Sequence, residues 1–374
     1  KALKNKYNIQ DFCNYTALRS NLEFLRQQPD IKYSSILLDE DIHNLYKNEP
    51  LDLNYIKWLE QEYGIPNLWP YLYLDRVIMY NQFVREYPYN TPHYTHEEMM
   101  RILQVTAKKI IKLFDEHKPD FVFFSAIASL SSLLLYHIAK KKNVTTLVAI
   151  VGRVGDLFLL SENYHDNSWA DKIFEQINKG QIENLWRDKA KKILESFRKE
   201  PTPYYAEESP NKKATSRQKQ FKFILPQHAW KSLTWFIKFS WQYFKNYHYR
   251  DYDEISPLFY LVDRIKRKTR CLLGFDDLYD KPDLNEDYAF YPLQLDPEMT
   301  TMLYAPFFTD QIYVIKQIAR SLPVHFKLYV KEHPAMVGYR PRTYYQELKK
   351  IPNIKLINPQ SMSFPLIRNC KLIT

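Results

Sequence analysis

Glycine is scarce in this chain: its 374 residues include only six, whereas about 7% is usual in proteins. The sequence holds neither a G-x-G-x-x-G dinucleotide fingerprint nor a glycine-rich phosphate loop of the Walker type. Its three cysteines, Cys13, Cys271 and Cys370, lie far apart and form no C-x-x-C pair. A disulfide framework and a structural zinc site are therefore not expected, and a reducing compartment is the simpler interpretation.

The length and charge of the chain indicate how many domains it has and what kind of partner it binds. A chain of 374 residues is longer than a domain with a single hydrophobic core usually is, so two domains are expected. Apolar residues make up 45% and charged residues 26%, a globular composition. Lysine and arginine exceed aspartate and glutamate by 53 to 43, which favours anionic partners such as nucleotides or anionic lipids. No recognised nucleic-acid module accompanies the charge, so nucleic acid is not an expected partner.

One uncharged stretch, residues 121–139, approaches the roughly 20 residues that a membrane-spanning helix needs. Four serines and one histidine interrupt it, and Lys118-Pro119-Asp120 precedes it as a turn would. We therefore predict a buried strand over 121–124 that leads into a helix from about residue 129.

The first half of the chain shows an alternating pattern of strands and helices. An apolar run over 33–38 and a β-branched run over 144–151 are typical of buried strands. Between them, apolar residues recur at helical spacing from Met99 to Phe114, after a start signal at Thr95. This alternation is typical of a doubly wound α/β domain.

A second α/β pattern begins near residue 286. Strands are expected over 288–293, 326–330, 354–357 and 371–373, with helices over 310–319 and 344–350. The sequence stops within what looks like a sheet, so we expect a truncated C-terminal domain. The predicted organisation is an N-terminal Rossmann-like, acceptor-side domain over 1–200, a linker with a basic and aromatic helical region over 201–285, and a partial C-terminal Rossmann-like domain over 286–374.

Three motifs of this second segment carry a family resemblance. They are Tyr-Pro-Leu-Gln-Leu-Asp-Pro-Glu at 291–298, Phe-Thr-Asp-Gln at 308–311 and Leu-Tyr-Val-Lys-Glu-His-Pro at 328–334. In this order and spacing they resemble the capsule polysaccharide biosynthesis family of bacterial glycosyltransferases, which includes the Kdo transferases of capsule assembly. The strong resemblance covers about 288–374. The Gly-Thr turn and glutamate-bearing helix that follow in the family do not occur here.

The resemblance implies a GT-B fold, in which two Rossmann-like domains face a common cleft and the C-terminal one holds the donor nucleotide. It implies transfer of a sugar from a nucleotide sugar to a saccharide or glycolipid acceptor, on the cytoplasmic side of the cell membrane. A CDP-glycerol-type glycerophosphotransferase shares the fold and a similar His-Pro element, and remains an alternative. Neither a cofactor nor a metal is expected.

The chemistry of such a transfer assigns roles to the 331–334 motif. Negative charge develops on the departing phosphate, and a metal-free site must meet that charge with positioned donors. His333, held by the turn that Pro334 imposes, is the candidate donor, and Lys331 supplies fixed positive charge. Glu332 belongs to the same donor-binding element, and Arg340 or Arg342 beyond the turn is a further candidate cation.

Three residues of the other two motifs are weaker candidates. Glu298 either contacts the donor sugar or ribose, or caps the helix that follows. Gln294 and Gln311 are assigned to donor binding, with solvated or structural roles as the alternative.

The acceptor side requires a group that removes a hydroxyl proton if configuration inverts. Asp156 is the candidate base, and Arg153 and Ser125 are assigned to the acceptor side, because they follow predicted strands where ligands bind in such sheets. The alternative for Asp156 is an ordinary strand-to-helix turn. The Asp-x-Asp pattern at 39–41 resembles a metal site of GT-A enzymes, but such patterns are frequent by chance, and no metal ligand is predicted.

Aromatic residues crowd the segment 228–250, where Lys231, Lys238 and Lys245 recur every seven residues. One interpretation is a helix that lies in a membrane interface. The other is a helix packed between two domains with its lysines in solvent. The first interpretation allows a peripheral protein on an anionic membrane surface, or even a non-catalytic scaffold that docks there.

Overall fold

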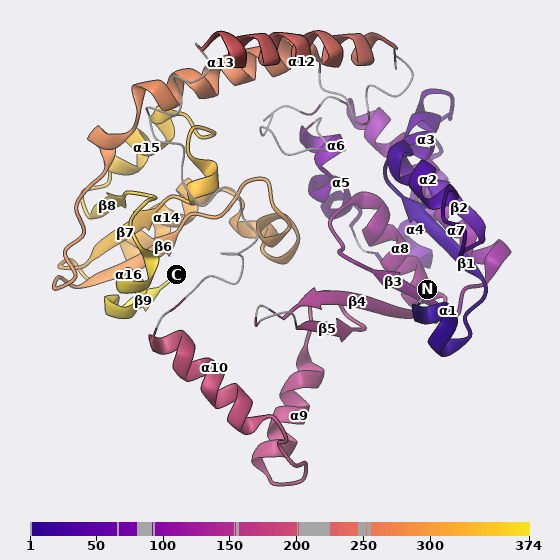
Figure 1. Cartoon of the computed structure of the whole chain (residues 1–374), viewed down its shortest axis with the longest axis horizontal. Helices are drawn as coiled ribbons and strands as arrows, with labels where there is room; N and C mark the ends of the chain where they lie inside the picture. Colours follow the sequence, from indigo (N-terminus) through magenta and orange to yellow (C-terminus); the bar gives the residue numbers. More distant parts are fainter. Residues whose placement is uncertain are drawn as a thin grey trace. The chain divides into compact units, whose positions relative to one another are not determined.

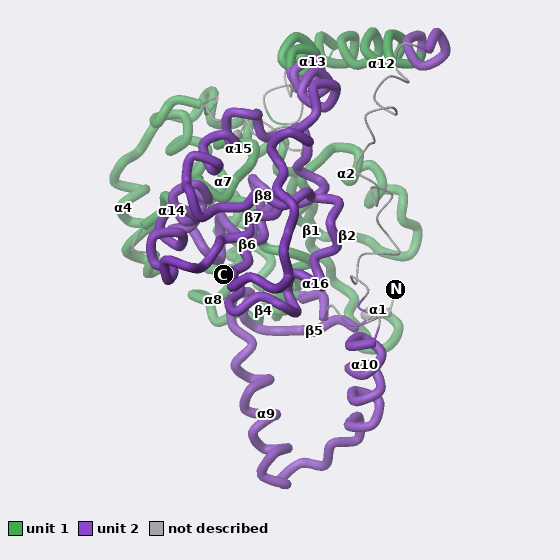
Figure 2. Tube along the Cα trace, turned by 90° about the vertical axis from the view of Figure 1, so that its left-hand side faces the viewer, with its two compact units in different colours: residues 1–148, 231–262 green, residues 149–230, 263–374 purple. Residues whose placement is uncertain are grey.

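The computed structural model describes residues 2–65, 67–80, 92, 94–152, 154, 157–199, 201, 225–245, 252 and 256–374. The chain divides into two compact units, each discontinuous in sequence. Unit 1 comprises residues 1–148 and 231–262, and unit 2 comprises residues 149–230 and 263–374 (Figure 2).

Unit 1 combines short parallel sheets with many helices (Figure 1). Its elements are α1 (Ala2–Tyr7), β1 (Phe12–Thr16), α2 (Arg19–Arg26), β2 (Tyr33–Leu38), α3 (Asp39–Asn44), η1 (Leu45–Lys47), α4 (Leu53–Glu62), α5 (Trp69–Leu74), α6 (Arg76–Tyr80), α7 (His96–His117), β3 (Phe121–Phe124), α8 (Leu130–Lys141) and most of α12 (Pro226–Lys245). Strand β4 (Thr145–Val151) follows α8.

The local sequence explains why α7 starts where it does. The Thr95 side chain accepts a hydrogen bond from the Glu98 backbone N–H, and the Glu98 carboxylate accepts one from the Thr95 N–H at 2.7 Å. This capping box satisfies two backbone donors that a helix start leaves unpaired. From there Ile102, Ile110 and Phe114 are buried in the core of unit 1.

The strands of unit 1 pair in parallel. β1 pairs with β2, and β3 pairs with β4. Helix α8 connects β3 to β4, and its Leu134 and Ile138 are fully buried. Parallel strands joined through a helix are the βαβ unit that the sequence predicted.

Unit 2 holds the second parallel sheet (Figure 1). Its elements are β5 (Phe158–Ser161), α9 (Ser168–Asn178), α10 (Arg187–Lys199), most of α13 (Pro257–Leu273), η3 (Asp276–Leu278), β6 (Tyr288–Pro292), η4 (Thr300–Tyr304), η5 (Pro306–Phe308), α14 (Gln311–Ser321), β7 (Lys327–Lys331), η6 (Pro334–Met336), α15 (Arg342–Lys349), β8 (Ile354–Ile357), α16 (Ser363–Asn369) and β9 (Leu372–Ile373).

The strand order of this sheet is β8-β7-β6-β9, and every pairing is parallel. In order of sequence the strands are third, second, first and fourth across the sheet, which is the Rossmann order. The direction of winding reverses between β6 and β9. In sheets of this kind, ligands bind beyond the carboxyl ends of the strands at that reversal.

Each face of the sheet has its own core. On one face Ala289, Tyr291, Leu328 and Val330 pack in a cluster with residues of α14 and α15. On the other face Tyr288, Phe290 and Tyr329 pack with Leu366 of α16. Alternate residues of β6 and β7 therefore point to opposite faces, and helices cover both, which defines a doubly wound sheet.

The α/β fold class and the doubly wound sheet confirm the sequence-based prediction. Strands β2, β3 and β8 have the predicted bounds, and α7, α8, α14 and α15 lie where helices were expected. The stretch 121–139 is a strand and a helix, and none of the described helices is long and apolar enough to span a membrane. The domain boundaries at 200 and 285 stay a prediction.

Candidate functional site

The carboxyl ends of three neighbouring strands of unit 2 are level with one another. Pro292 of β6 pairs with Lys331 of β7, and Lys331 pairs with Ile357 of β8. The Lys-Glu-His-Pro motif therefore begins at the middle of this edge, beside the strand where the winding reverses. The carboxyl edge of the sheet is the position at which a doubly wound fold presents its ligand site.

Lys331 is the last residue of β7 and is only 6% exposed. It lies two residues after Tyr329, so its side chain points to the face that α16 covers. Burial lowers the pKa of the Lys331 ammonium, and the neighbouring Glu332 opposes that shift. Within the described part of the chain, the ammonium has no hydrogen-bond or ion-pair partner. The residue as a whole is largely buried, which removes part of the hydration of its ammonium, and an anionic ligand would compensate for that loss.

Glu332 is fully buried and is held by three groups. Arg340 Nη1 donates to both carboxylate oxygens, at 2.7 and 2.8 Å. The Tyr345 hydroxyl donates to Oε2 at 2.7 Å, and the backbone N–H of His333 donates to Oε1 at 2.7 Å. Burial alone would lower the pKa of Arg340, but the Glu332 charge raises it above its usual value. The carboxylate thus fixes the loop after β7 from within.

The same arginine connects this loop to the one that follows β6. Arg340 Nη2 donates to the Gln294 carbonyl at 2.8 Å. Gln311, buried at the start of α14, accepts from the Gln294 N–H at 2.7 Å and donates to the Gln294 carbonyl at 3.3 Å. Both the N–H and the carbonyl of Gln294 are therefore hydrogen-bonded to side chains. These bonds connect the loop after β6 to the loop after β7.

Gly338 allows the chain to turn back toward Glu332. Its φ is +85°, in the left-handed region that favours glycine. A Cβ at this position would lie 2.5 Å from Cys271 Sγ of α13. The close turn brings Arg340 back to Glu332, eight residues before it.

His333 lies between the buried Glu332 and the short helix η6, and it is half-buried. Its Nδ1 accepts a hydrogen bond of 3.2 Å from the Ala335 N–H, in a turn that begins with Pro334. A neutral imidazole that accepts at Nδ1 carries its proton on Nε2. The ring is thereby prepared to donate from Nε2.

Two other predicted donor-side residues have partners of their own. The Glu298 carboxylate accepts from the Thr300 hydroxyl at 3.0 Å, but the N-cap of η4 is Met299 and no side chain makes a cap hydrogen bond there, so the capping alternative stays a prediction. Arg342 lies at the start of α15, where it donates to the Gly274 carbonyl at 2.5 Å and pairs with the exposed Asp277. Direct donor contacts by Glu298 and Arg342 stay predictions.

The acceptor-side residues are not brought together in the described part of the chain. Ser125 is exposed directly after β3. Arg153 and Asp156 fall outside the described residues, so their roles stay predictions.

A buried carboxylate cluster in unit 1 was not predicted. Asp39, at the carboxyl end of β2, accepts hydrogen bonds from the hydroxyls of Tyr15, Ser131 (3.1 Å) and Tyr252 (2.9 Å). Burial raises the pKa of Asp39 to about 6; the Tyr15 hydrogen bond opposes this and the charge of Asp75 adds to it. Its place at a strand end was visible in the sequence, but the three hydroxyl donors come from distant segments.

Asp75 belongs to the same region of unit 1. Its Oδ1 accepts from the N–H groups of Val77 and Ile78 in α6, and its Oδ2 accepts from the Leu130 N–H at the start of α8. One carboxylate therefore stabilises two helix starts, where unpaired N–H groups favour negative charge. Among the described residues, no group of three or more histidine, cysteine or acidic side chains could hold a metal ion.

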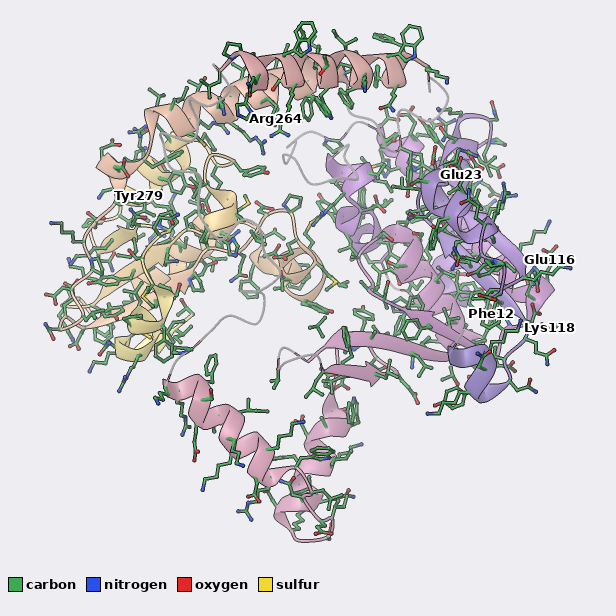
Figure 3. The ribbon with its side chains drawn as sticks, viewed as in Figure 1. Phe12, Glu23, Glu116, Lys118, Arg264 and Tyr279 are labelled. Atoms are coloured by element: carbon green, nitrogen blue, oxygen red, sulfur yellow. The ribbon has the colours of Figure 1, made fainter. Side chains whose placement is uncertain are left out.

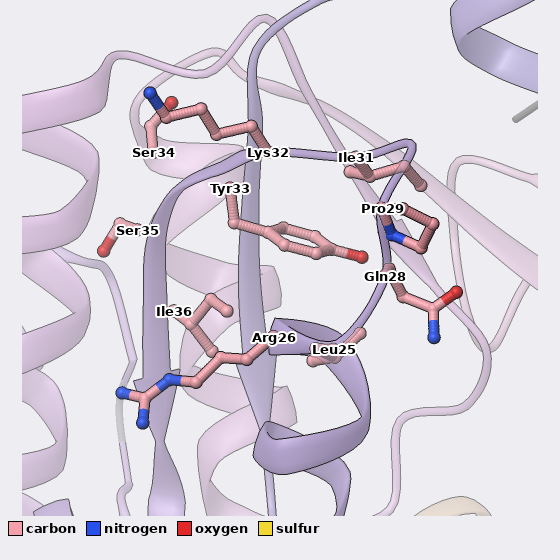
Figure 4. Close-up of a pocket in the computed structure, with 10 residues that line it drawn as sticks. All are labelled: Leu25, Arg26, Gln28, Pro29, Ile31, Lys32, Tyr33, Ser34, Ser35 and Ile36. Atoms are coloured by element: carbon pink, nitrogen blue, oxygen red, sulfur yellow. The ribbon is translucent and has the colours of Figure 1, made fainter.

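A hollow of about 530 Å³ lies elsewhere in unit 1 (Figure 4). Arg26, Gln28 and Lys32 contribute polar groups to it, and Tyr33 extends across it. These residues lie at the amino end of β2, opposite to the strand end at which parallel sheets bind ligands. Its position gives it no connection to the predicted site residues.

Comparisons with known proteins found no matching family model and no matching curated protein. Among solved structures, the chain is similar to a UDP-GlcNAc 2-epimerase from Neisseria meningitidis bound to UDP-GlcNAc, at 10% identity, with 97% of this chain and 76% of that chain covered and a TM-score of 0.21. The S. aureus MnaA–UDP structure is 7% identical, with 98% of this chain and 74% of that chain covered and a TM-score of 0.21. The epimerase from Methanocaldococcus jannaschii has 12% identity, 97% and 77% coverage and a TM-score of 0.18. Scores this low carry no argument about this chain.

Proposed function

We propose that this protein is a glycosyltransferase of GT-B architecture that moves a sugar from a nucleotide-sugar donor to a capsule or surface-polysaccharide acceptor. The observation that supports it most is Lys331, a largely buried lysine at the carboxyl edge of a doubly wound sheet, whose ammonium has no partner in the described part of the chain. A donor diphosphate would supply the missing negative charge.

In this proposal His333 acts on the leaving group. As the sugar bond to the diphosphate breaks, negative charge collects on the phosphate oxygen that departs. A donor at His333 Nε2 would stabilise that charge, and the Ala335 N–H keeps the ring in the required tautomer. Glu332, Arg340 and Gln311 would hold the surrounding loops in place without touching the donor. A base on the acceptor side, with Asp156 as the candidate, would take the hydroxyl proton.

The experiment compares the wild-type chain with His333→Ala in a panel of donors that includes CMP-sugars, UDP-sugars and CDP-glycerol. Loss of a positioned donor should lower turnover roughly 10²-fold or more. Transfer only from CDP-glycerol would instead identify a glycerophosphotransferase at the same site. Conversion of UDP-GlcNAc without an acceptor would identify an epimerase.

A matched variant separates chemistry from folding. His325→Ala removes an imidazole that is 64% exposed and precedes β7. It should leave turnover within about twofold, because surface substitutions of this kind have small effects. Full activity in His333→Ala, or equal losses in both variants, would contradict the role of His333.

We further propose that the protein works at the cytoplasmic face of the cell membrane, where its acceptor would be a growing saccharide or glycolipid. No metal or organic cofactor takes part in the proposed reaction, in which Lys331 and His333 meet the phosphate charge. Addition of EDTA should therefore leave turnover unchanged, and its abolition by EDTA would contradict this part of the proposal.

A further inference from the structure

Helix α12 is 20 residues long, and none of its residues is buried. A helix of this length extends for about 30 Å. It contains three tryptophans and three lysines, and no aspartate or glutamate occurs between Pro226 and Lys245. Its side chains are drawn in Figure 3, in which Arg264 marks the neighbouring α13.

Four exposed apolar side chains of α12 form one stripe, while Trp235, 46% exposed, lies on the other side of the helix. The four members, which we name the α12 stripe, have exposed fractions between 49% and 73%: Leu233, Ile237, Trp241 and Phe244. Their spacing of three and four residues places them within about 80° of the helix circumference. A stripe this narrow and this exposed is typical of a contact surface.

The opposite side of α12 packs against Tyr260 of α13. Trp235 and Phe239 stack on each other, and the Tyr260 ring of α13 lies 4.9 Å and 5.3 Å from them. These contacts fix the rotation of α12 about its axis. The α12 stripe therefore faces away from the packing that α13 provides.

The charged residues of α12 indicate which class of partner the α12 stripe contacts. Lys231, Lys238 and Lys245 follow one another at seven-residue spacing along one margin of the α12 stripe. The amphipathic helix α10 also exposes apolar residues, but it carries Asp188 and Glu195 among its lysines. Only positive charge borders the α12 stripe, and tryptophan prefers the boundary between lipid tails and head groups.

We propose that α12 lies in the surface of an anionic phospholipid bilayer, with the α12 stripe directed toward the acyl chains and the three lysines at the phosphate level. This is the geometry of interfacial amphipathic helices, which bind through apolar burial and electrostatic attraction together. The proposal does not depend on the catalytic function, because it concerns a different element and a different ligand.

The test is sedimentation of the full chain with phosphatidylcholine vesicles that contain or lack phosphatidylglycerol. Ile237→Glu/Trp241→Glu should lower the partition coefficient roughly tenfold or more, because two apolar groups are exchanged for carboxylates. The matched control is Phe307→Glu/Val324→Glu, which changes two side chains that are 91% and 100% exposed elsewhere. It should bind as the wild type does.

A charge variant tests the second part of the proposal. Each lysine near an anionic surface contributes roughly a fivefold factor in binding. Lys231→Gln/Lys238→Gln should therefore weaken binding to phosphatidylglycerol vesicles roughly 25-fold, and added salt should have a smaller effect on it than on the wild type. The control, Lys57→Gln/Lys281→Gln, should retain binding.

Several results would overturn the proposal. These are equal binding of wild type and Ile237→Glu/Trp241→Glu, equal losses in that variant and its control, or equal binding to neutral and anionic vesicles. Absence of vesicle binding, with a dimer that the glutamate variant dissociates, would assign the α12 stripe to a second copy of the chain instead. Circular dichroism and melting curves show whether each variant is folded. If a glutamate variant fails to fold, quenching of tryptophan fluorescence by brominated lipids, reduced in Trp241→Phe, locates the contact.

Discussion

The Tyr252 hydroxyl donates a hydrogen bond of 2.9 Å to Asp39 Oδ2, although 213 residues separate the two in the sequence. Tyr252 is 5% exposed and Asp39 is 9% exposed. Two further hydroxyls, those of Tyr15 and Ser131, donate to the same carboxylate. Tyr252, from late in the chain, is thus part of the polar core of unit 1.

Removal of the Tyr252 hydroxyl should destabilise the protein. A hydrogen bond to a charged group contributes about 1.5–3 kcal/mol to the free energy of unfolding. Tyr252→Phe is expected to lower stability by that amount in urea unfolding at neutral pH. The control is Tyr313→Phe, since Tyr313 is 57% exposed. A loss for Tyr252→Phe no larger than that of the control would contradict the contribution of this bond.

Ionisation of Asp39 should make stability depend on pH. Its pKa is raised from 3.8 to about 6 in the folded protein, chiefly by burial. Between these values the folded state binds more protons than the unfolded state, so stability decreases as pH rises. The shift corresponds to about 3 kcal/mol.

Asp39→Asn removes this contribution. The stability of the wild type minus that of Asp39→Asn should therefore fall by up to about 3 kcal/mol between roughly pH 4 and pH 7. Urea unfolding at several pH values measures it, with Asp41→Asn, at a position 49% exposed, as the control. Parallel pH profiles for wild type and Asp39→Asn would show that the Asp39 carboxylate does not titrate in this interval.

Substitution of Glu332 should be among the most destabilising single changes in unit 2. Glu332→Gln leaves the Arg340 guanidinium buried without its counter-charge, and breaking a buried pair costs about 3–5 kcal/mol. Asp277→Asn breaks the pair with Arg342, where the aspartate is 62% exposed, and should cost far less because solvent screens an exposed pair. The difference between the two variants in urea unfolding is the measurement, and similar losses would contradict it.

Lys331→Met should separate ligand affinity from stability. The substitution removes a desolvated cation, so melting temperature should stay the same or rise. Affinity for nucleoside diphosphates, measured by calorimetry, should fall roughly tenfold or more. Because the pKa of Lys331 lies below 10.5, wild-type affinity should begin to weaken with rising pH earlier than an ordinary lysine would allow. The control is Lys327→Met, at the start of the same strand, which should retain the affinity for nucleoside diphosphates. If Lys331→Met also retains this affinity, Lys331 does not contact the ligand.

Continuous apolar runs made much of the fold predictable. The strands over 33–38, 121–124 and 354–357 are such runs, and each agrees with the structure to the residue. Strand β1 was missed because Asn14 and Thr16 interrupt its apolar pattern. Helix α16 was missed because it is only seven residues long and contains Pro365, which usually ends a helix.

The candidate site was predictable in position but not in its internal contacts. The motif at 331–334 was expected at a strand end, and Lys331 does end β7. That Glu332 turns inward could not be foreseen, because its partners Arg340 and Tyr345 reach it only after the turn at Gly338 and the start of α15. A linear motif shows which side chains are near one another, but not which of them face the protein and which face a ligand.

The inward position of Glu332 affects how a mutational scan of this protein should be interpreted. Nearly every substitution at 332 will reduce activity, because the arginine that holds both loops loses its anchor. Selection by growth would rank this position with the reacting groups, even though its carboxylate lies wholly inside the protein. Sorting the surviving variants by cellular abundance would move Glu332 into the class of folding determinants and leave His333 in the class of functional ones.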